Sequence, residues 1–135
     1  MITGISHITF IVHDIEKATL FFENIFQAEM IYNSGEKTFS LSAERFFKVG
    51  NVWVAIMLGK PVPEKTYNHV AFKIDDCDFD EYEKRIKKMG IEIRESRNRI
   101  KEEGRSIYFY DYDNHLFELH TGTLNERLEA YHLIK

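Results

Sequence analysis

Two histidines and one glutamate stand out because each interrupts an apolar, alternating segment that is typical of a β-strand. His7 lies in segment 5–12 (ISHITFIV), His69 in segment 67–74 (YNHVAFKI), and Glu118 in segment 115–120 (HLFELH). A carboxylate in the middle of an apolar strand is costly to bury unless a cation neutralises it. Two imidazoles and one carboxylate on one divalent ion would satisfy all three side chains.

A histidine in a strand is more often a structural residue than a metal ligand. His7 and His69 favour the ligand role because they occupy the same place in two similar stretches of the chain. Alternation puts Glu118 and His120 on one face of their strand. His120 therefore has two interpretations, a structural hydrogen-bonding residue or a partner of a metal ligand.

The elements that would position these residues occur twice. The first strand, 5–12, is followed by Asp14, a preferred helix N-cap, and the second, 67–74, by Asp78. After each cap, apolar residues recur at the spacing of one helix face. They are Ile15, Ala18, Phe22 and Ile25 in the first copy and Phe79, Tyr82, Ile86 and Met89 in the second.

Three strand-like segments follow each helix. They lie at 29–33, 38–48 and 52–58 in the first copy, and at 91–94, 106–111 and 115–120 in the second. Segment 59–66 holds both prolines and is typical of a linker. The sequence therefore predicts an α+β fold with two tandem βαβββ modules, residues 1–58 and 67–135, in a single domain.

Composition excludes several classes of protein. The chain has 135 residues, with 18 Lys and Arg against 22 Asp and Glu, and a net charge of −4. No basic block indicates nucleic-acid binding, and no apolar run is long enough to cross a bilayer. The first residues lack a signal-peptide pattern, and Cys77 is the single cysteine. We expect a cytoplasmic protein with neither nucleic-acid nor membrane partners.

The order of the motifs resembles the vicinal oxygen chelate (glyoxalase-like) superfamily and, within it, the fosfomycin resistance proteins over essentially the whole chain. The motifs are TGISHIT at 3–9, YNHVAF at 67–72, EGRSIYF at 103–109, DYDNHLFELH at 111–120 and GTLNERL at 122–128. The resemblance implies that His7, His69 and Glu118 bind one metal ion. Mn²⁺ suits this mixed nitrogen and oxygen ligand set together with hard oxygen ligands from a substrate.

Other chemistries of that superfamily fit the sequence less well. Glyoxalases need a fourth ligand from the first module, but segment 53–58 (WVAIML) contains no His, Asp, Glu or Cys. Extradiol dioxygenases are about twice as long, and the antibiotic-sequestering relatives lack the three ligands. Of the superfamily chemistries compared, fosfomycin inactivation is the one that the sequence still fits.

Opening the fosfomycin epoxide needs a nucleophile, an electrophile for the ring oxygen and cations for the phosphonate. The forked donors of Arg127 suit the phosphonate, and the resemblance implies that Thr9, Ser106 and Tyr108 line the substrate pocket. Glu44 interrupts an otherwise apolar or small segment. On spacing alone it fits an ion pair with Arg45 or another neighbour at a sheet edge, whereas resemblance to the FosX-type hydrolases implies a general base that activates water.

We therefore expect a Mn²⁺-dependent epoxide hydrolase that converts fosfomycin to a vicinal diol. The alternatives are a glutathione or bacillithiol transferase acting on fosfomycin, and a metal-free protein that sequesters a small molecule. Two-module relatives commonly pair across chains. We expect a domain-swapped homodimer in which His7 of one subunit meets His69 and Glu118 of the other.

Overall fold

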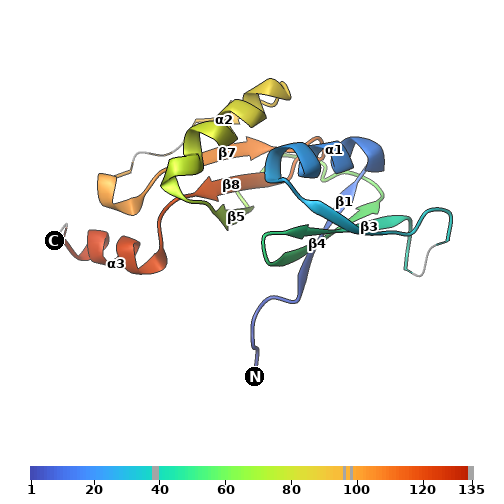
Figure 1. The fold of residues 1–135 in the computed structure, drawn as a ribbon, viewed down its shortest axis with the longest axis horizontal. Helices are drawn as coiled ribbons and strands as arrows, with labels where there is room; N and C mark the ends of the chain where they lie inside the picture. Colours follow the sequence, from blue (N-terminus) through green and yellow to red (C-terminus); the bar gives the residue numbers. More distant parts are fainter. Residues whose placement is uncertain (38–39, 96, 98, 134–135) are drawn as a thin grey trace. The chain divides into compact units, whose positions relative to one another are not determined.

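Each half of the chain builds a four-stranded sheet with a helix against one face, as the computed structural model shows (Figure 1). The structure describes residues 1–37, 40–95, 97 and 99–133. It divides into two compact units, residues 1–65 with 111–115, and residues 66–110 with 116–135. The described part of the chain contains no helix that is both long and apolar enough to span a membrane.

The first unit contains β1 (His7–Val12), α1 (Ile15–Phe26), β2 (Glu29–Asn33), β3 (Glu44–Val49) and β4 (Val52–Leu58). Its strand order is β1-β4-β3-β2, with β1 parallel to β4 and the other pairs antiparallel. The helix starts where expected, because the Asp14 side chain accepts a hydrogen bond from the backbone N–H of Lys17 at 3.0 Å.

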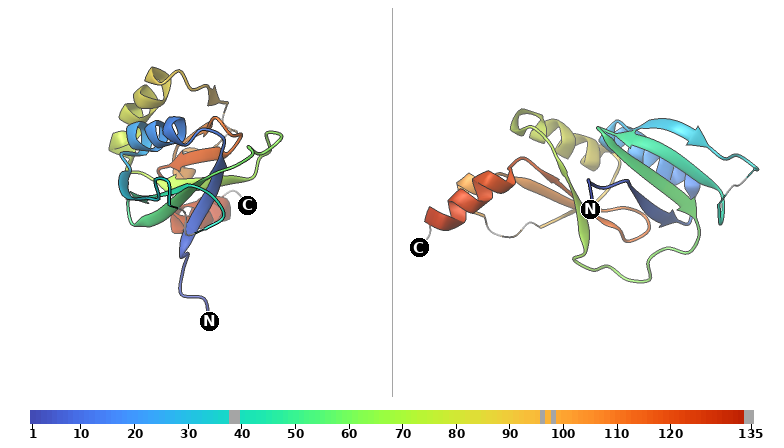
Figure 2. Two further views of the ribbon diagram at one scale, coloured as in Figure 1. Left: turned by 90° about the vertical axis from the view of Figure 1, so that its right-hand side faces the viewer. Right: turned by 90° about the horizontal axis from the view of Figure 1, so that it is seen from below.

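The predicted apolar stripe of α1 forms the core of the first unit. Ala18, Phe22 and Ile25 are buried, and the Phe22 ring stacks on Phe47 of β3 at 5.6 Å between centroids. The helix therefore covers one face of this sheet, as Figure 2 also shows, and leaves the other face open.

The second unit repeats this topology with β5 (His69–Lys73), α2 (Phe79–Lys88), β6 (Ile93–Arg94), β7 (Ser106–Tyr110) and β8 (Leu116–His120). Its strand order is β5-β8-β7-β6, again with the first pair parallel. Short 3₁₀ turns, η1 (Asp76–Asp78) and η2 (Lys101–Glu103), and a final helix, α3 (Leu124–Leu133), complete it. The prediction of two βαβββ modules is confirmed.

Two local expectations were wrong. Asp78 precedes α2, but its side chain makes no capping hydrogen bond because η1 already leads the chain into the helix. The strand expected at 38–48 begins only at Glu44, and Thr38 and Phe39 lie outside the described residues. Its neighbour β4 ends at Leu58, which donates to Ala43, so residues 40–42 have no ladder to join.

The connection between β7 and β8 belongs to the first unit, although it lies far along the chain. Asp113 in this turn is 1% exposed. One of its oxygens, Oδ1, accepts from the backbone N–H of His13 at 2.9 Å and contacts the ring Nδ1 at 2.6 Å. A buried carboxylate thus ties residues 111–115 to the end of β1.

Asp113→Ala should lower the free energy of unfolding by about 1–3 kcal/mol, because the partly buried His13 N–H loses its acceptor. Asp113→Asn keeps an oxygen acceptor at that position and should lose clearly less. Urea unfolding of both variants, followed by circular dichroism, measures the difference. Equal stability of Asp113→Ala and the parent protein would contradict this role of the turn.

Candidate metal and substrate site

The open face of the second sheet gathers most of the expected site residues. In the register of β8 with its neighbours, Glu118 lies between Ala71 of β5 and Tyr108 of β7. Ser106 pairs with His120, two residues further along each strand. Partners directly opposite each other share a face, so Glu118, Tyr108, Ser106 and His120 all project from the side that α2 does not cover.

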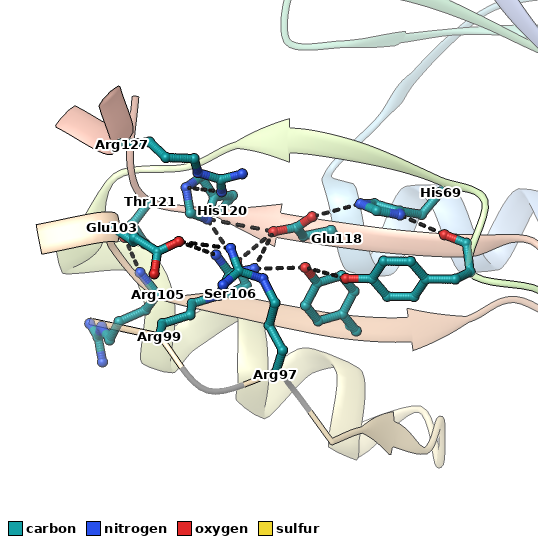
Figure 3. A network of polar contacts seen from close by, with 12 residues as sticks. His69, Arg97, Arg99, Glu103, Arg105, Ser106, Glu118, His120, Thr121 and Arg127 are labelled. Carbon is teal, nitrogen blue, oxygen red and sulfur yellow. Dashed lines mark hydrogen bonds and ion pairs between the residues drawn. The ribbon is translucent and has the colours of Figure 1, made fainter. Parts of the chain in front are cut away.

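The closest approach between two expected metal ligands is 3.0 Å, from His69 Nε2 to Glu118 Oε1 (Figure 3). His69 Nδ1 lies 2.7 Å from the carbonyl oxygen of Tyr67, which can only accept. A neutral imidazole would carry its hydrogen on Nδ1 and turn the lone pair of Nε2 toward the carboxylate. A cation would bridge two such facing acceptors, whereas a protonated ring would donate directly to Oε1.

This spacing fits a metal ion. When two ligand bonds of about 2.1 Å meet at about a right angle on an octahedral ion, the donor atoms lie about 3 Å apart. The hydrogen bond at Nδ1 is also the usual way in which a protein orients a histidine ligand. His69 and Glu118 thus form two of the positions expected for a divalent ion.

Glu118 is only 4% exposed, and its second oxygen is held by neighbours. Ser106 Oγ donates to Oε2 at 2.5 Å, and Arg99 Nη2 lies 3.3 Å from the same atom. Burial by itself raises the pKa of this carboxyl, but hydrogen bonds from Ser106 and Tyr108 and the charge of Arg99 outweigh it, so the net pKa is lowered. The group is ready to act as an ionised ligand.

Arg99 is buried beside this carboxylate, with 8% of its side chain exposed. Its Nη2 donates to the Tyr108 hydroxyl at 2.7 Å, and Tyr67 donates to the same hydroxyl at 3.2 Å. Burial, the hydrogen bond with Tyr67 and the charge of Glu118 raise the pKa of Tyr108, against the opposing charge of Arg99. Within the described part of the chain, Nε and Nη1 of Arg99 make no hydrogen bond. Arg99 thus belongs to the group of polar side chains around Glu118.

Glu103 anchors the loop before β7. It is 3% exposed and accepts from Arg97 at 2.8 Å, from the Tyr131 hydroxyl of α3 at 2.8 Å and from the Ile100 N–H at 3.1 Å. The hydrogen bond from Arg97 is the main reason that the pKa of Glu103 falls to about 2. An ionised carboxylate therefore holds the loop against α3, the helix that carries Arg127.

The open face of the first sheet carries the other expected residues. Register places His7 opposite Trp53, Thr9 opposite Ala55, and Glu44 opposite Met57, and these positions share one face. The His7 ring packs on Trp53 with 4.2 Å between centroids. Ser6 Oγ lies 2.9 Å from His7 Nδ1, which leaves Nε2 available for a ligand.

Glu44 is the first residue of β3 and is 8% exposed. The alternative ion pair with Arg45 is wrong, because adjacent residues of a strand point to opposite faces. Arg45 instead points toward α1, where it pairs with Glu16 and donates to Thr19 at 2.8 Å. Among the described residues, the Glu44 carboxylate takes part in no ion pair.

Neither unit on its own brings three His, Cys, Asp or Glu side chains together as a metal cluster within the described ranges. The second unit holds His69 and Glu118, and the first holds His7. Sequence analysis missed Trp53 as a neighbour of the site, and it treated Arg99 only as part of a basic loop, residues 97–101, that could either add positive potential or be a solvated charged segment. Alternation along β4 could have placed Trp53 on the face that His7 shares with Thr9, but no local signal distinguishes Arg99 from the other charges of its loop.

Comparison with known proteins identifies the family. The Glyoxalase/Bleomycin resistance protein/Dioxygenase superfamily matches residues 4–119. The fosfomycin resistance protein FosX of Listeria innocua is 60% identical over 98% of this chain and 99% of its own length. The metallothiol transferase FosB of Shouchella clausii is 39% identical over 97% of this chain and 88% of its own length.

A solved structure resembles the whole chain. It is a glutamate-to-glutamine variant of FosX from Listeria monocytogenes, complexed with Mn(II) and 1S,2S-dihydroxypropylphosphonic acid. It is 55% identical, has a TM-score of 0.89, and covers 98% of this chain and 100% of its own. The chain therefore belongs to the glyoxalase/bleomycin resistance/dioxygenase superfamily and, within it, to the FosX fosfomycin resistance proteins.

Proposed function

We propose that this protein is a Mn²⁺-dependent epoxide hydrolase that adds water to fosfomycin, yields the vicinal diol and confers fosfomycin resistance. The observation that carries the proposal is Glu44, a buried carboxylate without an ion-pair partner among the described residues, on the same sheet face as His7 and Thr9. The diol in the FosX structure of Listeria monocytogenes is the chemical product that water addition would give.

We assign the metal to His7, His69 and Glu118. Bound Mn²⁺ supplies Lewis-acid stabilisation to the epoxide oxygen and a fixed point for the phosphonate. Glu118 contributes an ionised oxygen, and the two histidines contribute Nε2 because Nδ1 of each is engaged by a neighbouring residue.

Glu44 is the proposed general base. Its carboxylate takes a proton from water as the water oxygen forms a bond to an epoxide carbon and the ring C–O bond breaks. The ring oxygen then takes a proton from solvent water and becomes the second hydroxyl of the diol, and Glu44 releases its proton to solvent, so that one water is added overall. Arg127, Thr9, Ser106 and Tyr108 are the proposed substrate contacts, with the Arg127 guanidinium matched to the phosphonate.

We also propose a domain-swapped homodimer in which His7 from one subunit completes the site of its partner. The proposal is supported by the division of the expected ligands between the two units, because neither unit gathers three candidate ligands within the described residues. We infer that the protein acts in the cytoplasm, where the exposed thiol of Cys77 would stay reduced.

The reaction itself is tested by mass spectrometry of fosfomycin incubated with the protein and Mn²⁺ but without any thiol. We expect a product with the mass of fosfomycin plus one water. A product that forms only after glutathione or bacillithiol is added would favour a transferase. Protection of fosfomycin at one molecule per site, without any product, would favour a sequestering protein.

The shared site is tested by pairs of inactive variants. His7→Ala and Glu118→Ala should each lose Mn²⁺ affinity and activity, because two of three ligands hold the ion weakly. If the ligands come from different subunits, a mixed dimer of these two variants contains one intact site and one empty of both residues. Random mixing should restore about a quarter of the parent activity.

Two controls make the mixing experiment decisive. His69→Ala mixed with Glu118→Ala should restore nothing, because both ligands come from the same subunit. His132→Ala, at an exposed position of α3, should keep parent metal content and activity. Failure of the His7 and Glu118 variants to complement would place their ligands in one chain, and normal Mn²⁺ binding by Glu118→Ala would remove that residue from the ligand set.

Glu44→Gln tests the base. The amide keeps the shape of the side chain but not its basicity, so hydrolysis should fall about a hundredfold or more. Mn²⁺ content and fosfomycin binding should stay close to the parent values, as measured by metal analysis and calorimetry. Hydrolysis at the parent rate would show that Glu44 is not the base.

A further inference from the structure

A chain of polar contacts runs from α3 to the expected metal ligand through His120. Arg127 Nη2 lies 3.4 Å from His120 Nε2, and His120 Nδ1 lies 2.7 Å from Ser106 Oγ. Ser106 Oγ in turn lies 2.5 Å from Glu118 Oε2. Figure 3 shows the four side chains in sequence along the open face of the second sheet.

The direction of every hydrogen bond in this chain is determined by its two ends. A guanidinium can only donate, so His120 Nε2 accepts from Arg127. The neutral ring then carries its hydrogen on Nδ1 and donates it to Ser106 Oγ. The serine hydrogen is left for Glu118, whose ionised carboxylate can only accept. One tautomer of His120 satisfies all these contacts.

The chain of contacts also decides which oxygen of Glu118 is free for a metal ion. Ser106 and Arg99 both approach Oε2, and His120 Nδ1 lies 3.5 Å from the same atom, while Oε1 faces His69 Nε2 at 3.0 Å. A carboxylate held by one oxygen cannot rotate freely, so its other oxygen keeps its direction. Ser106 thus orients the ligand, and His120 orients Ser106.

The backbone near His120 keeps space for the contact with Arg127. A Cβ atom on Gly122 would lie 2.8 Å from His120 Nε2 and 2.4 Å from the carbonyl oxygen of Glu103. A side chain at this position would therefore crowd the acceptor nitrogen of His120. Glycine leaves Nε2 accessible to the guanidinium of Arg127, which α3 carries.

We propose that His120 is a positioning residue. It accepts from the Arg127 guanidinium and donates to Ser106, and it thereby fixes the orientation of the metal-binding carboxylate of Glu118. The inference rests on the proposed function for the role of Glu118 as a metal ligand, and deepens it. His120 itself touches neither metal nor substrate. Its task is to hold Ser106 as a donor to Oε2, so that Oε1 stays directed at the ion.

The tautomer can be measured in the metal-free protein, independently of activity. Nitrogen-15 NMR of the imidazole rings should show His120 with a protonated Nδ1 and an unprotonated Nε2, the signals being assigned with His120→Asn. Arg127→Met removes the donor to Nε2 and should allow the other tautomer to appear. A dominant Nε2–H tautomer in the parent protein would overturn the proposal.

Two substitutions of His120 separate its two contacts. In His120→Asn the amide nitrogen lies near the place of Nδ1 and can still donate to Ser106, but nothing accepts from Arg127. In His120→Gln the longer amide reaches the place of Nε2 and leaves Ser106 without its donor. A purely structural role would make the two variants alike.

Calorimetric titration with Mn²⁺ in the absence of fosfomycin should therefore distinguish the variants. His120→Gln should lose about tenfold to a hundredfold in Mn²⁺ affinity, the usual effect of removing a residue that orients a ligand. His120→Asn should stay within about threefold of the parent. At saturating Mn²⁺, His120→Asn should instead raise the KM for fosfomycin, because Arg127 is less well held, with kcat nearly unchanged.

Equal Mn²⁺ affinity of the two variants, whether retained or lost together, would overturn the proposal. His132→Gln, on the exposed part of α3, serves as the matched control and should bind Mn²⁺ like the parent. The outcomes also separate this inference from the proposed function. A protein that shows the expected tautomer and the split in affinity but leaves fosfomycin unchanged would refute the hydrolase and keep the positioning role.

Discussion

The site depends on one constraint, a carboxylate buried in the middle of an apolar strand. Glu118 is nearly inaccessible, so its charge must be balanced by neighbours rather than by water. One oxygen is held by Ser106 and Arg99, and the other faces Nε2 of His69 at 3.0 Å. This pair of groups is the basis of the proposed cation site, since a metal ion between them would neutralise the carboxylate and use the lone pair of a neutral imidazole.

The repeated module places Glu118 in one copy and Glu44, the proposed base, in the other. In the register of the two sheets, Glu118 corresponds to Ala55, and Ser106 corresponds to Glu44. The second sheet therefore combines the proposed metal-binding carboxylate with a serine that donates to it. The first sheet offers no oxygen ligand at the matching place but presents a carboxylate at the strand start. The same backbone thus supports two different chemical tasks.

The loop before β7 and the last helix, α3, carry further residues that hold the side chains of the site in place. Glu103 joins the loop to this helix through Arg97 and Tyr131, and its low pKa keeps this link ionised well below neutral pH. Because the same helix carries Arg127, the loop and the proposed phosphonate contact are held by one buried carboxylate. Three of the proposed substrate contacts, Arg127, Ser106 and Tyr108, are therefore linked to Glu118 by polar contacts within the second unit.

The sequence by itself determined the repeated βαβββ order and the faces on which His7, His69 and Glu118 lie, because side-chain alternation and helical spacing are local properties. Only the tertiary structure decided which groups meet across strands and loops. It turned Arg45 toward α1, buried Arg99 beside Tyr108, and attached residues 111–115 to the first unit. These outcomes depend on strand register and on contacts between residues distant in sequence, which no local pattern encodes.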